Sequence, residues 1–575
     1  MSYLQKLRDA QTLLDVASIL GFKPSSLAYI LYKMPAAEKY TSFEIRKRGG
    51  GMRQIKAPAL PLRLLQRRLA NVLYSCLDEI EKSGKGRRSL AHGFERKRSI
   101  VTNASLHKRR RYVLNLDLED FFPSFNFGRV RGFFIKDKYF ALNEKIATLI
   151  AQIACHDNEL PQGSPCSPII SNLIGHLLDV RLARLAKTHK CTYSRYADDI
   201  TFSTNRKEFP PELAAPLPGS SSLWQLGATL VANIEGTGFR INQKKTRMQL
   251  RGSRQVTTGL LVNEKVNIRP ECYRLARNMC HTLFLTGTYY RSVPASLVGS
   301  AHTANRVKIP IETLRVLEGT LAHIHYVKRH APQQQHADKK LPSAQALYSR
   351  FLFYKNFVAL ETPLIIPEGK TDAIYLRSAI KKLTDYHPQL GHFVDGKFST
   401  ILRFMNCTST VRELVKLGTG TGALKHFIAN YKRMVESFGH APLAYPVILI
   451  IDNDDGAEGI FKVVKTSGGP PISHTSTKPF YHLFANLYLV KTPESDETPK
   501  SCIEDMFDAG ILKTVIGGKT FDPHKEHAAE GKYGKHVFAE KVVKPNVDTI
   551  DFSAFTKILD RIVAVLQHYA KRNGA

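Results

Sequence analysis

The sequence has no run approaching about 18 uninterrupted apolar residues, so no membrane-spanning helix is expected. Residues 1–6, M-S-Y-L-Q-K, do not open a signal peptide, and we expect no membrane partner. The eight cysteines are scattered and form no C-x-x-C pair, which argues against structural zinc and against a disulfide framework. These absences favour a protein of the reducing cytoplasm.

Acidic residues are scarce relative to basic ones. The 575-residue chain has 83 Lys and Arg against 50 Asp and Glu, which gives a net charge of +33. This excess is larger than solubility requires, and it indicates a polyanionic partner, most simply nucleic acid. The length is too great for one hydrophobic core, so we expect about two to four domains.

Residues 191–203, C-T-Y-S-R-Y-A-D-D-I-T-F-S, are rich in β-branched and aromatic residues and alternate apolar with polar positions after Asp199. This pattern predicts a β-hairpin with Asp198 and Asp199 at its tip. Asp is a common turn residue, so a solvated turn is one interpretation. A metal site is the other, because adjacent carboxylates repel each other unless a cation shares them.

Asp117 is a candidate partner for this acidic pair. It follows the apolar run 112–114 at the end of an expected strand. Together the three carboxylates could hold two Mg²⁺ ions about 4 Å apart, which would align a 3′-hydroxyl and a pyrophosphate leaving group for phosphoryl transfer. Spacing alone does not make the two strands neighbours.

Asp117 followed by the run Y-A-D-D at residues 196–199 resembles the palm of a reverse transcriptase. The resemblance implies that the three aspartates are catalytic. It also implies that two metal ions are bound by Asp117, Leu118, Asp198 and Asp199.

Residues 86–111 form the most basic stretch of the chain and lead into the Asp117 strand, which favours a nucleic-acid track over a merely solvated face. Within it, N-A-S-L-H at residues 103–107 would by itself predict a buried structural histidine. In this position it resembles the N-A-x-x-H hallmark of retron reverse transcriptases. Nucleic-acid contacts are therefore expected from Arg53 in the glycine-rich turn 47–58, Arg67 on an amphipathic helix 62–73, Asn103, His107, Arg109, Arg110 and Arg111.

Further motifs follow in the order that the family has them. The loop L-P-Q-G-S-P at residues 160–165 resembles the one that meets the incoming nucleotide, which implies that role for Gln162. Asp120 and Phe122 match positions of the nucleotide pocket, where the Phe122 ring would clash with a ribose 2′-hydroxyl and select dNTPs. Lys244 and Lys245 are both candidates to neutralise or protonate the leaving pyrophosphate.

The segment V-T-T-G at residues 256–259 resembles the primer-gripping hairpin, although retrons usually show V-T-G, so the alignment stays open there. Residues 268–327 then have a helical and basic pattern, as expected of a thumb. Residues 331–340 are polar and are expected to form a linker.

The second half has two acidic clusters, each after an apolar strand. Residues 363–366 lead into E-G-K-T-D at 368–372, and the apolar run 445–451 leads into D-N-D-D-G at 452–456. The second run predicts a strand buried on both faces of a parallel sheet. Open α/β sheets place their sites at such strand ends. A calcium loop and a solvated turn are the alternatives for residues 452–456, although EF-hand spacing is not followed, since no Glu falls at the twelfth position.

The combination of E-G-K-x-D with D-x-D resembles a Toprim domain. The resemblance implies that Glu368 is a general acid/base or a ligand and that Asp452 and Asp454 hold Mg²⁺. Residues 501–507, S-C-I-E-D-M-F, resemble a further acidic motif of OLD-type Toprim nucleases. Glu504 would then be a ligand, with a plain helix-start residue as the alternative. The remaining candidates for this site are Lys370, Asp372 and Lys535, the last as a cation for the developing phosphorane charge.

The expected fold is multidomain, α+β and α/β, with a right-hand fingers-palm-thumb polymerase followed by a Toprim α/β domain that has a mainly parallel sheet. The expected boundaries are 1–100 for the N-terminal helices and fingers, 101–265 for the palm, 266–345 for the thumb and linker, and 346–575 for the Toprim effector.

The resemblance implies a retron-type RNA-directed DNA polymerase that copies a cognate structured noncoding RNA into branched msDNA from dNTPs. Two Mg²⁺ ions are expected in the polymerase site and one or two in the Toprim site. The fused Mg²⁺-dependent nuclease-like effector suggests anti-phage defence. The alternative is a conventional-primer reverse transcriptase whose C-terminal half is a non-catalytic nucleic-acid-binding or assembly module. Homo-oligomerisation is left open.

Overall fold

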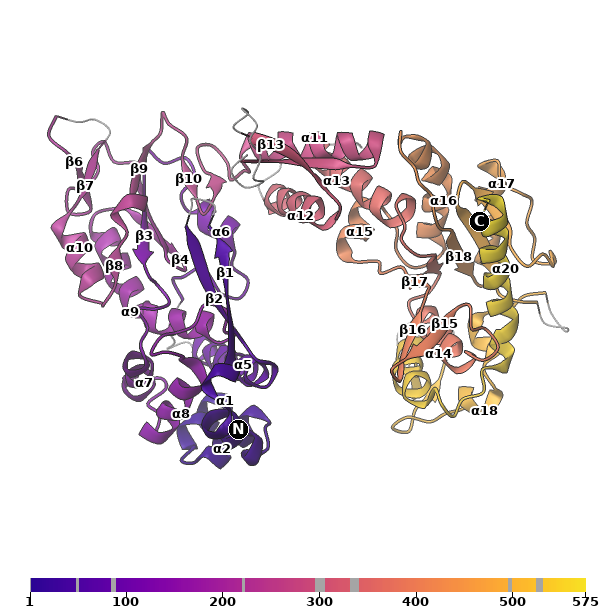
Figure 1. Ribbon diagram of the computed structural model, residues 1–575, viewed down its shortest axis with the longest axis horizontal. Coiled ribbons are helices and arrows are strands. Elements are labelled where there is room, and N and C mark those ends of the chain that lie inside the picture. The colour runs from indigo at the N-terminus through magenta and orange to yellow at the C-terminus, as the bar shows by residue number, and fades with distance from the viewer. Residues whose placement is uncertain are drawn as a thin grey trace. The chain divides into compact units, whose positions relative to one another are not determined.

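The computed structural model describes residues 2–47, 51–83, 89–219, 223–294, 306–330, 341–494, 499–523 and 531–574 (Figure 1). The expected linker 331–340, residues 48–50 of the glycine-rich turn and residues 86–88 of the basic stretch lie outside this set. The chain divides into two compact units, residues 1–269 with 327–335 and residues 270–326 with 336–575.

The first unit begins with short helices, as the sequence predicted. They are α1 (Tyr3–Asp9), α2 (Leu13–Leu20), α3 (Pro24–Ala28), a π-helical turn (Tyr29–Lys33) and α4 (Ala36–Lys39). A capping box between Thr12 and Asp15 starts α2, and Gly21 ends it with φ of +66°, a left-handed conformation that glycine adopts without a Cβ clash.

A two-stranded antiparallel sheet and a long helix follow. The strands are β1 (Tyr40–Arg46) and β2 (Met52–Pro58), and the helix is α5 (Leu60–Lys82). The predicted amphipathic helix 62–73 is therefore confirmed and is longer than expected. Its apolar face, which includes Leu62, Leu65, Leu69 and Leu73, is buried in the core of this unit.

The centre of the first unit is a five-stranded antiparallel sheet in the order β4-β5-β3-β8, with β9 also paired to β3. Its strands are β3 (Tyr112–Glu119), β4 (Thr192–Tyr196), β5 (Asp199–Thr204), β8 (Arg240–Ile241) and β9 (Arg247–Leu250). Both the strand before Asp117 and the hairpin carrying Asp198 and Asp199 are thus confirmed. Their apolar residues, among them Leu114, Leu116, Ile200 and Phe202, are buried in one core.

Helices and short hairpins complete this unit. They are α6 (Ile100–Ser105), α7 (Phe127–Lys136), α8 (Glu144–Ala154), α9 (Ser167–Thr188), β6 (Ala214–Pro216), β7 (Trp224–Leu226), α10 (Ala228–Glu235), β10 (Val256–Thr257) and β11 (Leu260–Leu261). Of these, α9 and α6 contact β4 directly.

The second unit starts with α11 (Pro270–Thr286), β12 (Tyr289–Pro294), β13 (Arg306–Ile311) and α12 (Arg315–His330). The prediction of a helical segment over 268–327 was therefore wrong in its middle, where β12 and β13 pair as an antiparallel hairpin. The reason is visible in V-K-I-P-I at residues 307–311, where apolar residues alternate with Lys308 and Pro310 at the period of a strand.

Helix α11 packs on the C-terminal half of the chain through aromatic side chains. The Phe284 ring lies 5.5 Å from the Tyr354 ring and 5.1 Å from the Phe438 ring, centroid to centroid. The Arg350 guanidinium lies 4.9 Å from the centre of the Phe284 ring. The segment expected to be a thumb thus shares a core with the residues beyond the linker.

The rest of the second unit is built on a five-stranded sheet in the order β17-β14-β18-β20-β19. The first four strands are parallel, and β19 is antiparallel to β20. They are β14 (Leu364–Pro367), β17 (Arg403–Phe404), β18 (Val447–Ile451), β19 (Tyr481–Phe484) and β20 (Leu487–Lys491). All five residues of β18 are buried, as the uninterrupted apolar run predicted.

Helices and small strands surround this sheet. They are α13 (Ser343–Phe353), a π-helical turn (Tyr354–Val358), α14 (Asp372–Lys382), β15 (Gly391–Val394), β16 (Lys397–Thr400), α15 (Ser409–Leu414), α16 (Thr421–Glu436), α17 (Ala457–Thr466), a 3₁₀ turn (Ile503–Met506), α18 (Ala509–Leu512), β21 (Thr520–Phe521), β22 (Lys532–Tyr533), α19 (Lys535–Val537) and α20 (Thr556–Arg572).

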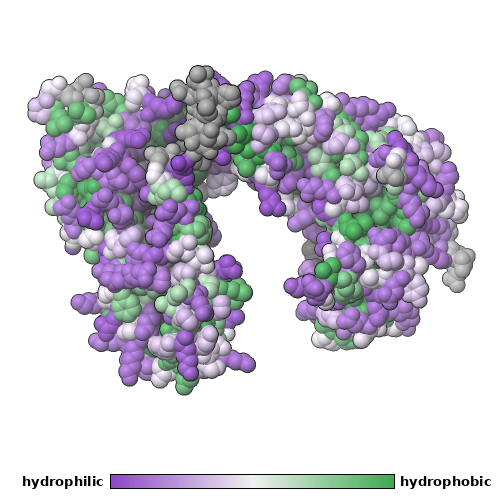
Figure 2. All heavy atoms as spheres, in the orientation of Figure 1, coloured by the Kyte–Doolittle hydropathy of each residue, from purple (hydrophilic) through white to green (hydrophobic). Residues whose placement is uncertain are grey.

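Hydrophilic residues cover most of the face of each unit that is seen in Figure 2, in keeping with the high content of Lys and Arg. Across the described ranges, no single helix has the length and apolar composition needed to cross a bilayer. One bent pair, Leu13–Leu20 with Pro24–Lys33, passes that test jointly, with 106° between its halves.

Candidate functional site

The β4–β5 hairpin, called the aspartate hairpin from here on, brings its two acidic residues next to Asp117. Asp117 on β3 pairs directly with Asp199 on β5, and the Leu118 N–H donates to the Asp198 carbonyl over 3.0 Å. Ala197 forms the turn with φ of +56°, a left-handed conformation. The strand of Asp117 and the aspartate hairpin are therefore adjacent in the sheet. The hydrocarbon side chain of Leu118 has no ligating atom and is buried, so only its main-chain carbonyl is a candidate metal ligand.

The carboxylates of this cluster are poorly hydrated and repel one another, which raises the pKa of two of them. Restricted hydration and then the charge of Asp117 raise the pKa of Asp198. Restricted hydration, followed by the charges of Asp198 and Asp117, raises the pKa of Asp199 to about 7. The Lys245 ammonium relieves part of this repulsion, because it lies 2.8 Å from both carboxylate oxygens of Asp117.

Mg²⁺ is the cation that this donor set fits. Its ligands are hard oxygens, and the raised pKa values show that the site favours either protons or another positive charge. Among the described residues no three His, Cys, Asp or Glu side chains already converge in metal-ligand geometry. The Lys245 ammonium contacts both carboxylate oxygens of Asp117, so a metal ion bound there would compete with it.

A cavity of about 800 Å³ opens beside the aspartates and contains most of the predicted nucleotide-pocket residues. Asp117, Asp120, Phe122, Gln162 and Lys245 all line it, as does Arg53 from β2. The Gln162 carbonyl accepts a hydrogen bond from the Lys56 N–H over 2.9 Å, which ties the loop to β2. Lys244 is exposed and is not among the lining residues, so of the two predicted lysines only Lys245 lies at the site.

The predicted nucleic-acid-binding arginines lie in different environments. Arg53, Arg67, Arg109 and Arg111 are exposed. Arg110 is half-buried and donates to the Thr192 hydroxyl over 3.2 Å, so its guanidinium is partly engaged within the protein.

Asn103 and His107 correct the prediction of nucleic-acid contact, because both have 0% exposure. A capping box between Ser99 and Thr102 starts α6, and the helix directs Asn103 into the core. His107 contacts Ser203 and Ser194, each over 2.7 Å. Burial lowers its pKa to about 3, so the imidazole is neutral. The structure thus has the buried structural histidine that the motif by itself predicted.

Sequence reasoning missed an ion pair that supports the aspartate hairpin. The buried Arg195 guanidinium binds Asp179 of α9 with Nε–Oδ1 of 2.6 Å and Nη2–Oδ2 of 2.7 Å. Its Nη1 donates to the carbonyl of Ala197 in the turn over 3.0 Å. The sequence signal was weak, since β4 reads T-Y-S-R-Y and only the charge of Arg195 within a predicted strand indicates an acidic partner.

A second acidic site lies at the carboxyl ends of two adjacent parallel strands of the second unit. Glu368 follows β14 and Asp452 follows β18, and the Asp452 N–H donates to Glu368 Oε2 over 3.3 Å. Burial first, then Asp454 and Asp372, raise the pKa of Glu368 to about 7. Burial first, then Asp372, Glu504 and Glu368, raise the pKa of Asp452 to about 8.

Of the other predicted residues of this site, some are buried in it and others are exposed at its edge. Glu504 is buried and ion-paired with Lys535 over 3.0 Å, and its Oε1 atom has no partner among the described residues. Such an orphaned carboxylate oxygen fits a cation ligand. Asp372 accepts from the Gly369 N–H over 2.7 Å and so shapes the loop after β14. Asp454 and Lys370 are exposed at the rim.

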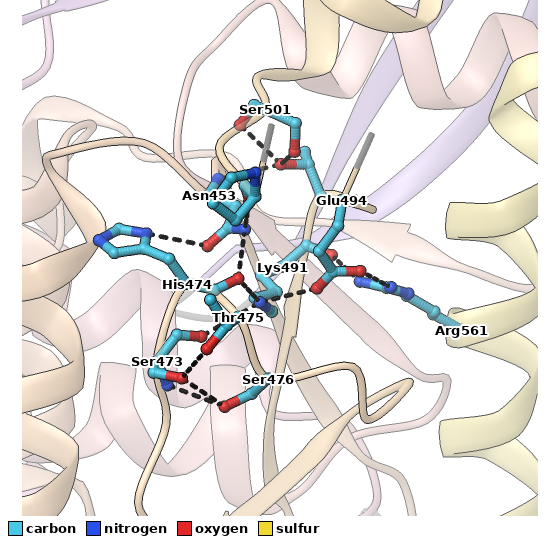
Figure 3. Close-up of polar contacts among 11 residues, drawn as sticks. Asn453, Ser473, His474, Thr475, Ser476, Lys491, Glu494, Ser501 and Arg561 are labelled. Carbon is cyan, nitrogen blue, oxygen red and sulfur yellow. Dashed lines mark hydrogen bonds and ion pairs between the residues drawn. The ribbon is translucent and has the colours of Figure 1, made fainter. Parts of the chain in front are cut away.

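A polar network fixes the loops of this second site (Figure 3). Asn453, between the two aspartates, donates through Nδ2 to the carbonyls of His474, over 3.0 Å, and Pro499. The buried Lys491 ammonium donates to the same His474 carbonyl over 2.6 Å and pairs with Glu494 over 2.7 Å. Backbone bonds between Asn453 and Ser501 hold the segment that leads to Glu504. The loops that carry the acidic residues are therefore fixed by hydrogen bonds and do not form a solvated turn.

Comparison with known proteins gives a match over the first unit. A family model described as reverse transcriptase (RNA-dependent DNA polymerase) matches residues 45–269. The retron Mx65 reverse transcriptase of Myxococcus xanthus is 35% identical over 284 residues, 46% of this chain and 62% of the relative. The retron Ec86 reverse transcriptase of Escherichia coli is 33% identical over 273 residues, 47% of this chain and 77% of the relative.

The chain therefore spans 62% of the length of the Myxococcus relative. Among solved structures, apo telomerase from Candida tropicalis aligns over 42% of this chain and 50% of its own, at 16% identity and a TM-score of 0.30. The span matched by the family contains Asp117, the aspartate hairpin, the cavity and the N-A-x-x-H motif. On the identity to retron Ec86 reverse transcriptase and the share of it that is covered, the chain belongs to the retron reverse transcriptases.

Proposed function

We propose that this chain is an RNA-directed DNA polymerase that copies a cognate structured noncoding RNA into branched msDNA. The observation that carries the proposal is the pairing of Asp117 with Asp199 beside Asp198, at the mouth of the 800 Å³ cavity. In the reaction the 3′-oxygen bonds to the α-phosphorus of a dNTP, and the bond to pyrophosphate breaks.

The aspartates and four residues near them have separate roles in this proposal. Asp117, Asp198, Asp199 and the Leu118 carbonyl would hold Mg²⁺, which would supply Lewis-acid activation of the 3′-hydroxyl and neutralise the phosphates. The Phe122 ring excludes a ribose 2′-hydroxyl, and the loop of Gln162 supports the base pair being formed. Once displaced from Asp117, the Lys245 ammonium is free to neutralise the departing pyrophosphate.

The test is on nucleic acid that co-purifies with the protein, because a net charge of +33 favours a bound polyanion. The wild type is compared with the double variant Asp198→Ala/Asp199→Ala. Short DNA joined to RNA through a branched guanosine 2′-linkage, released by a debranching enzyme and missing from the variant, supports the proposal. Unbranched nucleic acid in both preparations contradicts branched priming and favours the conventional-primer alternative.

For the second unit we propose a Toprim nuclease-like effector that depends on Mg²⁺ and acts in phage defence in the cytoplasm. The buried Glu504 Oε1 atom, without a partner among the described residues and next to Glu368 and Asp452 at the strand ends, supports it. Glu368 would serve as general acid/base or ligand, Asp452, Asp454 and Glu504 as ligands, and Lys535 as the cation facing the phosphorane. In this proposal the msDNA complex restrains the effector until infection disturbs it.

The test uses Glu368→Gln in the full chain, with Glu540→Gln, at a residue ion-paired with Lys544, as the matched control. Glu368→Gln should abolish toxicity and phage protection while msDNA synthesis and nucleic-acid binding persist. Retained toxicity and protection in that variant would leave the non-catalytic binding or assembly module as the better account of the second unit.

A further inference from the structure

His107 is bonded to both strands of the aspartate hairpin. Its Nδ1 lies 2.7 Å from Ser203 Oγ on β5, and its Nε2 lies 2.7 Å from Ser194 Oγ on β4. All three residues have 0% exposure. A neutral imidazole has one N–H donor and one acceptor nitrogen, so one serine hydroxyl accepts from the ring and the other donates to it. The ring thus satisfies both serines without burying a charge.

The two serines lie on the face of the hairpin that also carries Asp199. In the strand register Thr192 pairs with Ser203, Ser194 with Thr201, and Tyr196 with Asp199. Residues two apart along a strand point to the same face, so Ser194, Ser203 and Asp199 share one face. A bridge between β4 and β5 at this point fixes how the strands diverge toward the turn of Asp198.

The opposite face of the hairpin is fixed separately. Arg195, next to Ser194, points to the other side, where it binds Asp179 of α9 and the carbonyl of Ala197. The two contacts hold the same strand from both faces, since Ser194 bonds toward α6 and Arg195 bonds toward α9. Rotation or sliding of β4 would break one set or the other.

The segment that carries His107 also holds the β10–β11 hairpin, which resembles the primer-gripping hairpin. The Thr258 hydroxyl donates to the Ile100 carbonyl at the start of α6 over 3.2 Å. The Arg109 N–H donates to the Val262 carbonyl over 2.9 Å. Residues 100–109 therefore bond to both hairpins, and His107 is the side chain that connects this segment to the aspartates.

We infer that His107 is a positioning residue that sets the aspartate hairpin relative to the β10–β11 hairpin, and so sets the primer 3′-hydroxyl relative to the aspartates. It acts through Ser194 and Ser203 and touches no substrate, because it is fully buried. The inference rests on the proposed polymerase function. It gives the N-A-x-x-H motif an internal role at the site in place of a surface contact with nucleic acid.

The experiment measures single-nucleotide incorporation on a primed RNA template by the full-length protein, at saturating Mg²⁺. His107→Leu keeps most of the volume and removes both hydrogen bonds, whereas His107→Gln keeps one donor and one acceptor. We expect kcat of the Leu variant to fall by about 10- to 100-fold, the size expected when reacting groups are displaced by an ångström. The KM for dNTP should change less, because Phe122 and Gln162 do not belong to either hairpin, and the Gln variant should regain activity.

The matched control is Ile150→Ala on α8, a fully buried position whose helix packs against α5 and α7. It loses stability through a cavity and should keep kcat at temperatures below unfolding. Wild-type kcat in folded His107→Leu would overturn the inference. If that variant does not fold, Ser194→Ala and Ser203→Ala decide, since wild-type kcat in both would overturn it as well. A folded wild-type protein without any incorporation contradicts the polymerase function itself, a separate result.

Discussion

Replacing Asp179 by Asn should loosen the aspartate hairpin more than any other single change on α9. Asp179 and Arg195 are both buried, with side-chain exposures of 2% and 0%, and meet through two hydrogen bonds of 2.6 and 2.7 Å. The neutral amide in Asp179→Asn would leave the guanidinium charge buried without a counter-charge. Removing one partner of such a pair costs about 3–5 kcal/mol, mostly because the remaining charge is uncompensated.

Amide hydrogen exchange in β4 and β5 of the full-length chain is the suitable assay, since it reports opening of one element in a protein with several domains. A loss of about 3–5 kcal/mol corresponds to exchange that is faster by about two to three and a half orders of magnitude. The apolar double variant Asp179→Leu/Arg195→Met should exchange far closer to the wild type, because neither charge remains. Unchanged exchange in Asp179→Asn, or equal damage in the double variant, would refute the reasoning.

Three further predictions concern the first unit. Burial lowers the pKa of His107 to about 3 and that of His92 to about 4. Below pH 6.5, the ordinary pKa of histidine, the unfolded chain therefore protonates both imidazoles while the folded protein keeps them neutral. Stability is therefore lost as pH falls, by about 2 kcal/mol per histidine between pH 6.5 and 5, which urea unfolding at both pH values measures. Phe122→Ala should raise ribonucleotide incorporation relative to dNTPs by about 10- to 100-fold in competition assays, and an unchanged ratio would exclude Phe122 as the 2′-hydroxyl filter. Asn103→Leu should leave the melting temperature unchanged or higher, because neither polar atom of the Asn103 amide has a partner among the described residues. A lower melting temperature would mean that this amide is bonded in solution.

Local patterns predicted the parts of the fold that depend on local chemistry. Alternation of apolar and polar residues located the aspartate hairpin, and the uninterrupted run 445–451 located β18 as a buried parallel strand. Both signals report which side chains face a core, and the spacing of apolar residues in the sequence shows this directly. The same alternation was present in residues 307–311, where the expectation of a helical thumb concealed the β12–β13 hairpin.

What the sequence could not give were contacts between distant segments. Asp179 and Arg195 are neighbours only because α9 packs under β4, and no spacing rule pairs them. The inward turn of Asn103 and His107 depends on a capping box at Ser99 and on the serines of two later strands. Glu504 reaches the acidic site of the second unit through the backbone pairing of Asn453 with Ser501, which also arises only on folding.

The packing of Phe284 against Tyr354 and Phe438 decides where this chain can be divided. A cut in the polar stretch 331–340 looks natural from composition, yet it would leave Phe284 on one fragment and both of its ring partners on the other. Each fragment would then expose an apolar surface and tend to aggregate. A cut near residue 269 keeps the cluster whole. An exchange of the C-terminal half between related chains should therefore carry α11 with it, because Phe284 of this helix packs on two rings of that half.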